Sequence, residues 1–124
     1  MKVLLVEDSE DDRIALRVMI EELGHQVVEA IDGKQAVQAT VDHNPDFVLM
    51  DLSMPVVDGL QATAAIRAIS RFPGRVPIVA MTAFQESFTE DEAFKAGCDG
   101  YLQKPIRLDN LMKVFRSSST EVDL

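Results

Sequence analysis

The sequence has little cysteine, few basic residues and no long apolar run, and each shortage excludes a class of protein. Cys98 is the only cysteine, so no disulfide can form within the chain and an oxidising compartment is not implied. Twelve Lys and Arg stand against 21 Asp and Glu, which gives a formal net charge of −9. Because a net-negative body repels nucleic acid and anionic membranes, we expect neither as a partner. The first apolar run, Val3–Val6, is too short for a signal peptide or a membrane span, so a cytoplasmic location is expected.

The length of the chain sets the expected domain organisation. With 124 residues, of which 47% are hydrophobic and 27% charged, the chain fits one domain with a core of its own. We expect this domain to span residues 1–116 and the polar residues 117–124 to form a short flexible tail. A start at Met1 favours a native N-terminus, but the tail could be a true end or the beginning of a linker to another domain.

Five short runs rich in aliphatic residues predict strands. The first, third and fourth are apolar without alternation, which is typical of parallel strands that are covered on both faces. The second alternates more and indicates an edge strand. The runs are Val3–Val6, Gln26–Ala30, Phe47–Met50, Pro77–Met81 and Gly100–Gln103.

Segments with helical spacing separate these runs, and several begin at a capping residue. Ser9, Asp32, Asp58 and Thr89 each stand where a helix N-cap is expected. The first helix is expected to bury one apolar face made of Ile14, Leu16, Val18, Met19, Ile20 and Leu23. Strands that alternate with helices predict an α/β fold, with a parallel sheet covered by helices on both faces.

Polar residues stand at the carboxyl ends of four of the five predicted strands. Glu7 and Asp8 follow the first strand, Asp51 the third, Thr82 the fourth and Lys104 the fifth. Ligands of open parallel sheets bind outside the carboxyl ends of the strands, so these residues are expected to share one crevice.

Three carboxylates in one crevice require cations beside them. Two like charges about 4 Å apart cost roughly 4 kcal/mol at an effective dielectric of about 20. Lys104 supplies one positive charge, and Mg²⁺, a hard ion that prefers oxygen ligands, would supply two more. We expect Asp8 and Asp51 to bind the ion directly and Glu7 to bind it through water. A carboxylate in this setting can attack phosphorus, which makes Asp51 a candidate phosphoryl acceptor, with Lys104 and Thr82 neutralising the phosphoryl oxygens.

These residues resemble the receiver domain of two-component response regulators. The resemblance spans roughly Lys2 to Phe115 and is highly specific because its motifs occur together and in order. The motifs are Glu7-Asp8, the stretch from Met50 to Gly59, Thr82-Ala83 and Lys104-Pro105.

The resemblance implies a flavodoxin-like three-layer sandwich with five helices and a five-stranded sheet in the order 2-1-3-4-5. The phosphoryl donor would be a phosphohistidine on a sensor histidine kinase or a histidine phosphotransfer protein. The backbone carbonyl of Ser53 would complete the Mg²⁺ site, and a cis peptide would join Lys104 to Pro105. On phosphorylation Thr82 and Tyr101 would move, and the face made by the fourth helix, fifth strand and fifth helix would select a downstream protein. A phosphorylation-dependent dimer through that face is left open.

Two neighbouring positions are expected to set the lifetime of the acyl phosphate. In the family, the residues two beyond the acceptor and two beyond the threonine tune hydrolysis, and here they are Ser53 and Phe84. Our hypothesis is that the apolar Phe84 hinders water and lengthens the lifetime; an unchanged or slower dephosphorylation of Phe84→Ala would contradict it.

Each site residue also has a structural interpretation. Glu7 and Asp8 could be acidic residues at a helix N-terminus, Asp51 an aspartate at the start of a loop, Thr82 an ordinary strand residue, Lys104 an exposed loop charge and Tyr101 plain packing.

Other polar residues are interpreted structurally. We interpret His25 and His43 as surface residues, Cys98 as inert, and Asp11 and Asp12 as charges that favour the helix start and solubility.

Two other functional classes share parts of this pattern. Phosphohydrolases of the haloacid-dehalogenase type also form an aspartyl phosphate, but their nucleophile lies in an Asp-x-Asp motif after the first strand. A flavodoxin-like cofactor binder would need a Gly-rich phosphate loop where this chain has an acidic pair. Both classes remain alternatives to a regulatory domain that is not a turnover enzyme.

Overall fold

The computed structural model describes residues 1–54, 58–69, 75–83 and 90–122, with side chains described up to residue 117. The capping position Thr89 and the lifetime position Phe84 lie outside these residues. Within them, strands and helices alternate along the chain as expected. The elements are β1 (Lys2–Val6), α1 (Glu10–Glu22), β2 (Gln26–Ala30), α2 (Gly33–His43), β3 (Phe47–Asp51), α3 (Gly59–Ala68), β4 (Ile78–Thr82), α4 (Glu90–Ala96), β5 (Gly100–Gln103) and α5 (Leu108–Val122).

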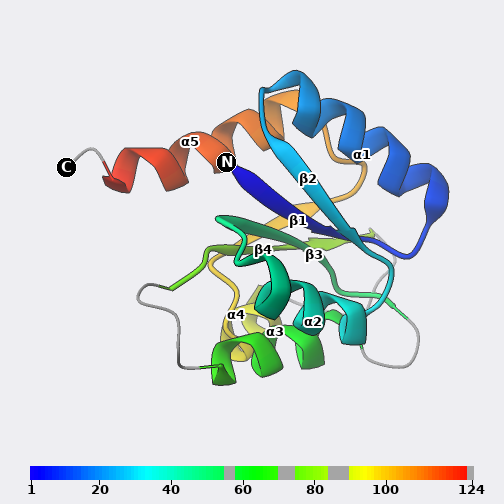
Figure 1. Cartoon of the computed structure of the whole chain (residues 1–124), viewed down its shortest axis with the longest axis vertical. Helices are drawn as coiled ribbons and strands as arrows, with labels where there is room; N and C mark the ends of the chain where they lie inside the picture. The colour runs from blue at the N-terminus through cyan, green and yellow to red at the C-terminus, as the bar shows by residue number, and fades with distance from the viewer. Residues whose placement is uncertain (55–57, 70–74, 84–89, 123–124) are drawn as a thin grey trace.

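The sheet is parallel and has the strand order β2-β1-β3-β4-β5, which confirms the predicted topology. Helices α1 and α5 cover one face of the sheet, and α2, α3 and α4 cover the other (Figure 1). The chain therefore forms the expected three-layer sandwich. Every residue of β3 and β4 is buried, whereas the edge strand β2 is mostly exposed or half-buried.

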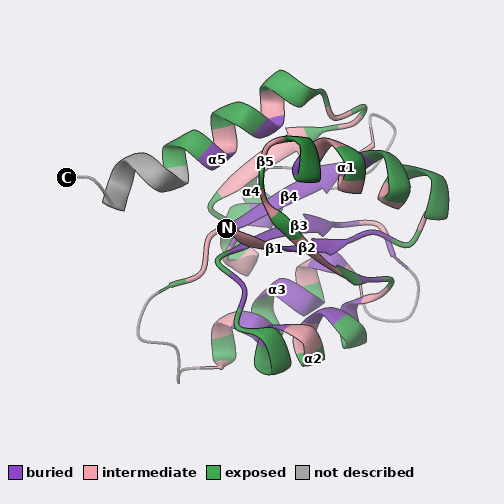
Figure 2. Cartoon of the chain, turned by 45° about the horizontal axis from the view of Figure 1, so that its top comes forward, coloured by how far each residue is buried: buried purple, intermediate pink, exposed green. Residues whose placement is uncertain are grey.

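Successive strand residues point to opposite faces, so the sheet divides the core into two clusters. The cluster under α1 and α5 contains Val3, Leu5, Leu49 and Met81 from the strands, with Leu16, Ile20, Leu111 and Phe115 from the helices. The cluster on the other face contains Leu4, Val6, Met50 and Ala80, with Ala36, Ala62, Ile66 and Ala93 from the helices. Figure 2 shows this buried central sheet between helices whose outer turns are exposed.

The predicted caps of the first three helices are present. The side chains of Ser9, Asp32 and Asp58 each accept a hydrogen bond from a backbone N–H in the first turn of α1, α2 and α3. At Asp58 the cap is reciprocal, because the side chain of Gln61 also accepts from the backbone N–H of Asp58. These caps place the starts of α1 and α3 at the carboxyl edge of the sheet, beside the ends of β1 and β3.

The predicted apolar face of α1 is wrong at two positions. Ile14 and Val18 are 52% and 51% exposed, and only Leu16 and Ile20 are buried. Residues of an α-helix are separated by 100°, so Ile14 and Val18 lie opposite the buried side. The helix thus carries apolar residues on its solvent side as well.

Two smaller expectations also differ from the structure. The first residues of the predicted tail are helical, because α5 continues to Val122; serine and threonine lower helix propensity by only about half a kcal/mol per residue. His25 is half-buried rather than a surface residue, and its ring packs edge-on against Phe115.

None of the helices in the described ranges has the length and apolarity to cross a membrane.

Candidate functional site

The carboxyl edge of the sheet brings together the polar residues that the sequence singled out. Glu7, Asp51 and Thr82 are 0%, 2% and 1% exposed, so their polar side chains must find partners inside the protein. Asp8 is exposed beside them. One oxygen from each of Glu7, Asp8 and Asp51 lies within 4.8 Å of the others. The predicted convergence of three carboxylates is therefore present.

Lys104 reaches this cluster from the loop after β5. Its Nζ lies 2.5 Å from Glu7 Oε1 and 3.7 Å from Asp51 Oδ2. Its backbone N–H donates a hydrogen bond of 2.7 Å to the carbonyl of Thr82, and a cis peptide links it to Pro105. The side chain of Lys104 thus contacts two buried carboxylates, while its backbone is bound to the end of β4.

One ammonium does not balance the carboxylates. Burial, together with the hydrogen bond and the charge of Glu7, raises the pKa of Asp51 from 3.8 to about 8, against the opposing effects of Lys104 and of the Ser53 N–H. Burial lowers the pKa of Lys104, but the hydrogen bond that it donates to Glu7 and the charges of Asp51, Glu7 and Asp12 raise it more. Without a further cation the site therefore retains a proton near neutral pH.

This arrangement fits a hard divalent cation. All three groups of the cluster offer carboxylate oxygens, the ligands that Mg²⁺ prefers, and the excess negative charge is what such an ion would neutralise. The backbone N–H of Ser53, two residues beyond Asp51, donates a hydrogen bond of 3.1 Å to Asp51 Oδ1. This bond keeps the Ser53 backbone beside the carboxylate of Asp51.

The remaining predicted residues lie in different places. The Thr82 hydroxyl donates a weak hydrogen bond of 3.4 Å to the carbonyl of Ala83 at the end of β4. Tyr101 is half-buried on β5 and packs against the core cluster on the α2–α3–α4 face. Phe84 lies outside the described residues.

Two residues beside the site were missed as functional candidates. Asp12, interpreted as a solubility residue, has its Oδ2 only 3.7 Å from Lys104 Nζ. Gly59, named only as the end of the Met50–Gly59 motif, lies so close to β3 that a Cβ atom there would overlap the Asp51 carbonyl oxygen. The position of Asp12 in the first turn after the β1 end was a usable signal. The glycine itself permits a close backbone approach, but the sequence did not show which segment Gly59 contacts.

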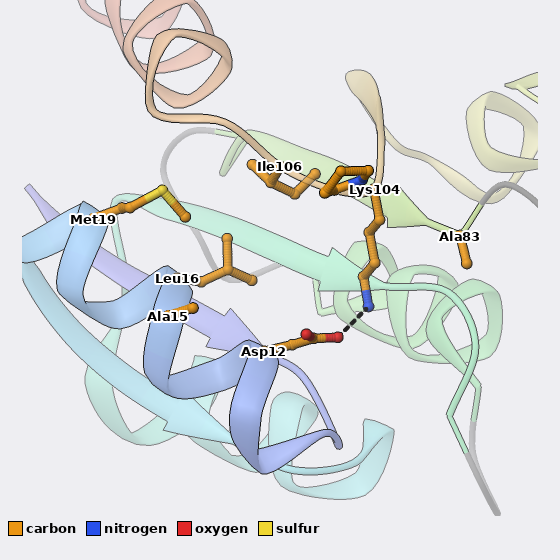
Figure 3. A pocket seen from close by; sticks show the side chains of 8 residues that line it. Asp12, Ala15, Leu16, Met19, Ala83, Lys104 and Ile106 are labelled. Atoms are coloured by element: carbon orange, nitrogen blue, oxygen red, sulfur yellow. Dashed lines mark ion pairs between the residues drawn. The ribbon is translucent and has the colours of Figure 1, made fainter.

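A groove runs from this site along α1. It encloses about 500 Å³ and is lined by Asp12, Ala15, Leu16 and Met19 of α1 and by Ala83, Lys104, Pro105 and Ile106 from the opposite side. Figure 3 shows Lys104 and Asp12 facing each other across one end, with apolar side chains toward the other.

The fold and the acidic edge of the sheet together are those of an α/β signalling receiver. The chain belongs to the response regulator receiver domain family, which it matches over residues 3–116. This membership decides against the phosphohydrolase and cofactor-binding alternatives.

Named relatives and solved structures agree with the family. The chain is 30% identical to the polar-differentiation response regulator DivK of Brucella ovis over 93% of both chains. It is 35% identical to the receiver domain of the sensor histidine kinase PA1611 of Pseudomonas aeruginosa, with a TM-score of 0.85 and 94% of each chain covered. That structure has a magnesium ion coordinated in the active site cleft. The chemotaxis protein CheY4 of Vibrio cholerae is 28% identical, with a TM-score of 0.85 and 94% and 97% of the two chains covered.

Proposed function

We propose that this domain is a phosphorylation-dependent switch of a phosphorelay and that Asp51 is its phosphoryl acceptor. The observation that carries the proposal is the buried Asp51 carboxylate, which lies beside two other carboxylates and 3.7 Å from the Lys104 ammonium. A buried aspartate that shares one ammonium with other carboxylates lowers the stability of the folded protein, and a role as phosphoryl acceptor would explain its presence.

The side chains of the site have distinct roles in this proposal. An Asp51 oxygen attacks the phosphorus of the donor, Lys104 neutralises a phosphoryl oxygen, and the Thr82 hydroxyl donates a hydrogen bond to another. Asp8, Asp51 and the Ser53 carbonyl would hold Mg²⁺, with Glu7 acting through water, and the ion would supply further neutralisation of the phosphoryl charge. The protein contributes position and charge, and turnover is limited to self-catalysed transfer and autodephosphorylation.

The donor we propose is a phosphohistidine on a sensor histidine kinase or a histidine phosphotransfer protein. The relatives support this class of partner, since one is a response regulator and another is a receiver domain of a sensor histidine kinase. The groove beside α1 supports it sterically, because it leads to Lys104, which lies 3.7 Å from Asp51, and offers apolar contacts next to that lysine.

The output we propose passes through the α4–β5–α5 face to a downstream protein. Thr82 lies at the end of β4 and Tyr101 on the neighbouring β5. A shift of the threonine toward a phosphoryl group would therefore change the packing beside Tyr101. Dimerisation through this face, a lifetime set by Ser53 and Phe84, and a cytoplasmic location stay predictions.

Phosphorylation by acetyl phosphate tests the acceptor directly. We expect intact-mass spectrometry to show one phosphoryl group added to the wild-type protein with Mg²⁺ and none after the metal is chelated. Asp51→Asn is expected to remain unmodified, and Asp58→Asn, at a nearby helix cap, to react as the wild type does. Addition that persists in Asp51→Asn would place the acceptor elsewhere.

A further inference from the structure

Asp12 and Lys104 both line the groove and face each other at one end of it. It lies in the first turn of α1, where its backbone N–H donates to Ser9 Oγ at 3.4 Å, and its Oδ2 lies 3.7 Å from Lys104 Nζ. Figure 3 shows the two side chains reaching toward each other at the end of the groove. The cap at Ser9 sets where α1 begins and so fixes the carboxylate of Asp12 beside the lysine.

Asp12 differs from the other carboxylates that contact Lys104. The side chains of Glu7 and Asp51 are 0% and 3% exposed, whereas that of Asp12 is 55% exposed. A phosphoryl donor that approaches Lys104 along the groove therefore passes close to the exposed charge of Asp12. Because the donor is itself an anion, this charge opposes the approach in proportion to the donor's own charge.

We propose that Asp12 is a positioning and specificity-determining residue that holds Lys104 at the groove and favours phosphoryl donors of low net negative charge. It selects N–P donors of the phosphoramidate class over dianionic acyl phosphates. This inference rests on the proposed function of Asp51 as the acceptor, and it concerns which donor the same site prefers.

The two classes of donor differ in charge but lead to the same product. With phosphoramidate, which carries one net negative charge in its zwitterionic form, the Asp51 oxygen forms a bond to phosphorus, the N–P bond breaks and neutral ammonia leaves with the protons it already holds. With acetyl phosphate, a dianion, the same O–P bond forms, the acyl O–P bond breaks and acetate leaves with the electron pair. The aspartyl phosphate is identical, so a ratio of the two rates reports on the approach of the donor.

The experiment compares the rate constants for phosphorylation by acetyl phosphate and by phosphoramidate, with Mg²⁺, at low and at high salt. For Asp12→Asn we expect the ratio of acetyl phosphate to phosphoramidate rates to rise by about threefold to tenfold at low salt. The rise should shrink at high salt, because a partly exposed charge is screened. Asp12→Glu retains the charge and should keep the wild-type ratio within about twofold.

Asp11→Asn is the matched control. Asp11 is exposed in the same turn and makes no ion pair with Lys104 within the described residues. Its substitution removes one negative charge, as Asp12→Asn does, but leaves the contact with Lys104 in place. A ratio that stays at the wild-type value in Asp12→Asn, or rises equally in Asp11→Asn, would overturn the inference while the function of Asp51 stands. A wild-type protein that neither donor phosphorylates would overturn both.

Discussion

The burial of Asp51 makes a prediction about stability that needs no phosphoryl donor. The folded protein holds a proton on Asp51 up to about pH 8, whereas an ordinary aspartate releases it near its usual pKa of 3.8. Between these values the folded state binds more protons than the unfolded chain. Its free energy of unfolding therefore falls as the pH rises through this window, and the effect is complete above the folded pKa.

The size of the effect follows from the change in pKa. Each pKa unit corresponds to about 1.4 kcal/mol, so the rise from 3.8 to about 8 sets a ceiling of about 6 kcal/mol. Lys104 and Glu7 share the charge of Asp51, and water can enter the crevice. We therefore expect Asp51→Asn to stabilise the metal-free protein by about 2–3 kcal/mol near pH 8 and by under about 1 kcal/mol near pH 5.

Urea denaturation followed by circular dichroism, with a metal chelator present, measures this difference. Asp91→Asn is a control for the loss of an acidic side chain, because Asp91 is exposed in the first turn of α4. Added Mg²⁺ should reverse the order, since only the wild type retains the complete set of carboxylates and gains stability from the ion. A stabilisation by Asp51→Asn that is absent near pH 8, or that shrinks as the pH rises, would refute the reasoning.

Two further predictions concern packing around the site. Gly59→Ala should destabilise the protein by about 1–3 kcal/mol, because its Cβ must displace the Asp51 backbone; it should also slow phosphorylation by acetyl phosphate, and a stable, fully reactive variant would contradict the contact. Arg67→Met should cost about 2–3 kcal/mol in urea denaturation, since the mostly buried Arg67 donates to two backbone carbonyls and to Asp99. Arg75→Met is its control and should cost under about 1 kcal/mol, because Arg75 is mostly exposed; equal losses would show that burial is not what distinguishes the two.

The strands and the members of the acidic cluster could be predicted because their signals are local. An uninterrupted apolar run as short as Phe47–Met50 favours a buried strand, and the parallel topology then carries the next residue to the shared edge. Asp51 and Lys104 are therefore brought together by rules that need no coordinates. The same reasoning placed Ser9 and Asp58 at helix starts, where their side chains do accept backbone hydrogen bonds.

The predictions that were wrong or missing depend on how the helices are oriented on the sheet. Ile14 and Val18 fit an apolar pattern as well as Leu16 does, and only the packed orientation of α1 decides which of them is buried. The contact of Asp12 with Lys104 likewise depends on the directions of two side chains from separate parts of the fold. Gly59 approaches Asp51 through backbone packing between α3 and β3, which no residue type announces.

The ion pair between Glu7 and Lys104 joins residues that are 97 positions apart in the chain. A nascent polypeptide on the ribosome carries the acidic half of this pair long before it carries the basic half. Any fragment that ends before β5 lacks the counter-charge, and closing so long a loop costs more chain entropy than closing a short one. The balanced set of charges at the edge of the sheet is therefore complete only once the last strand has docked.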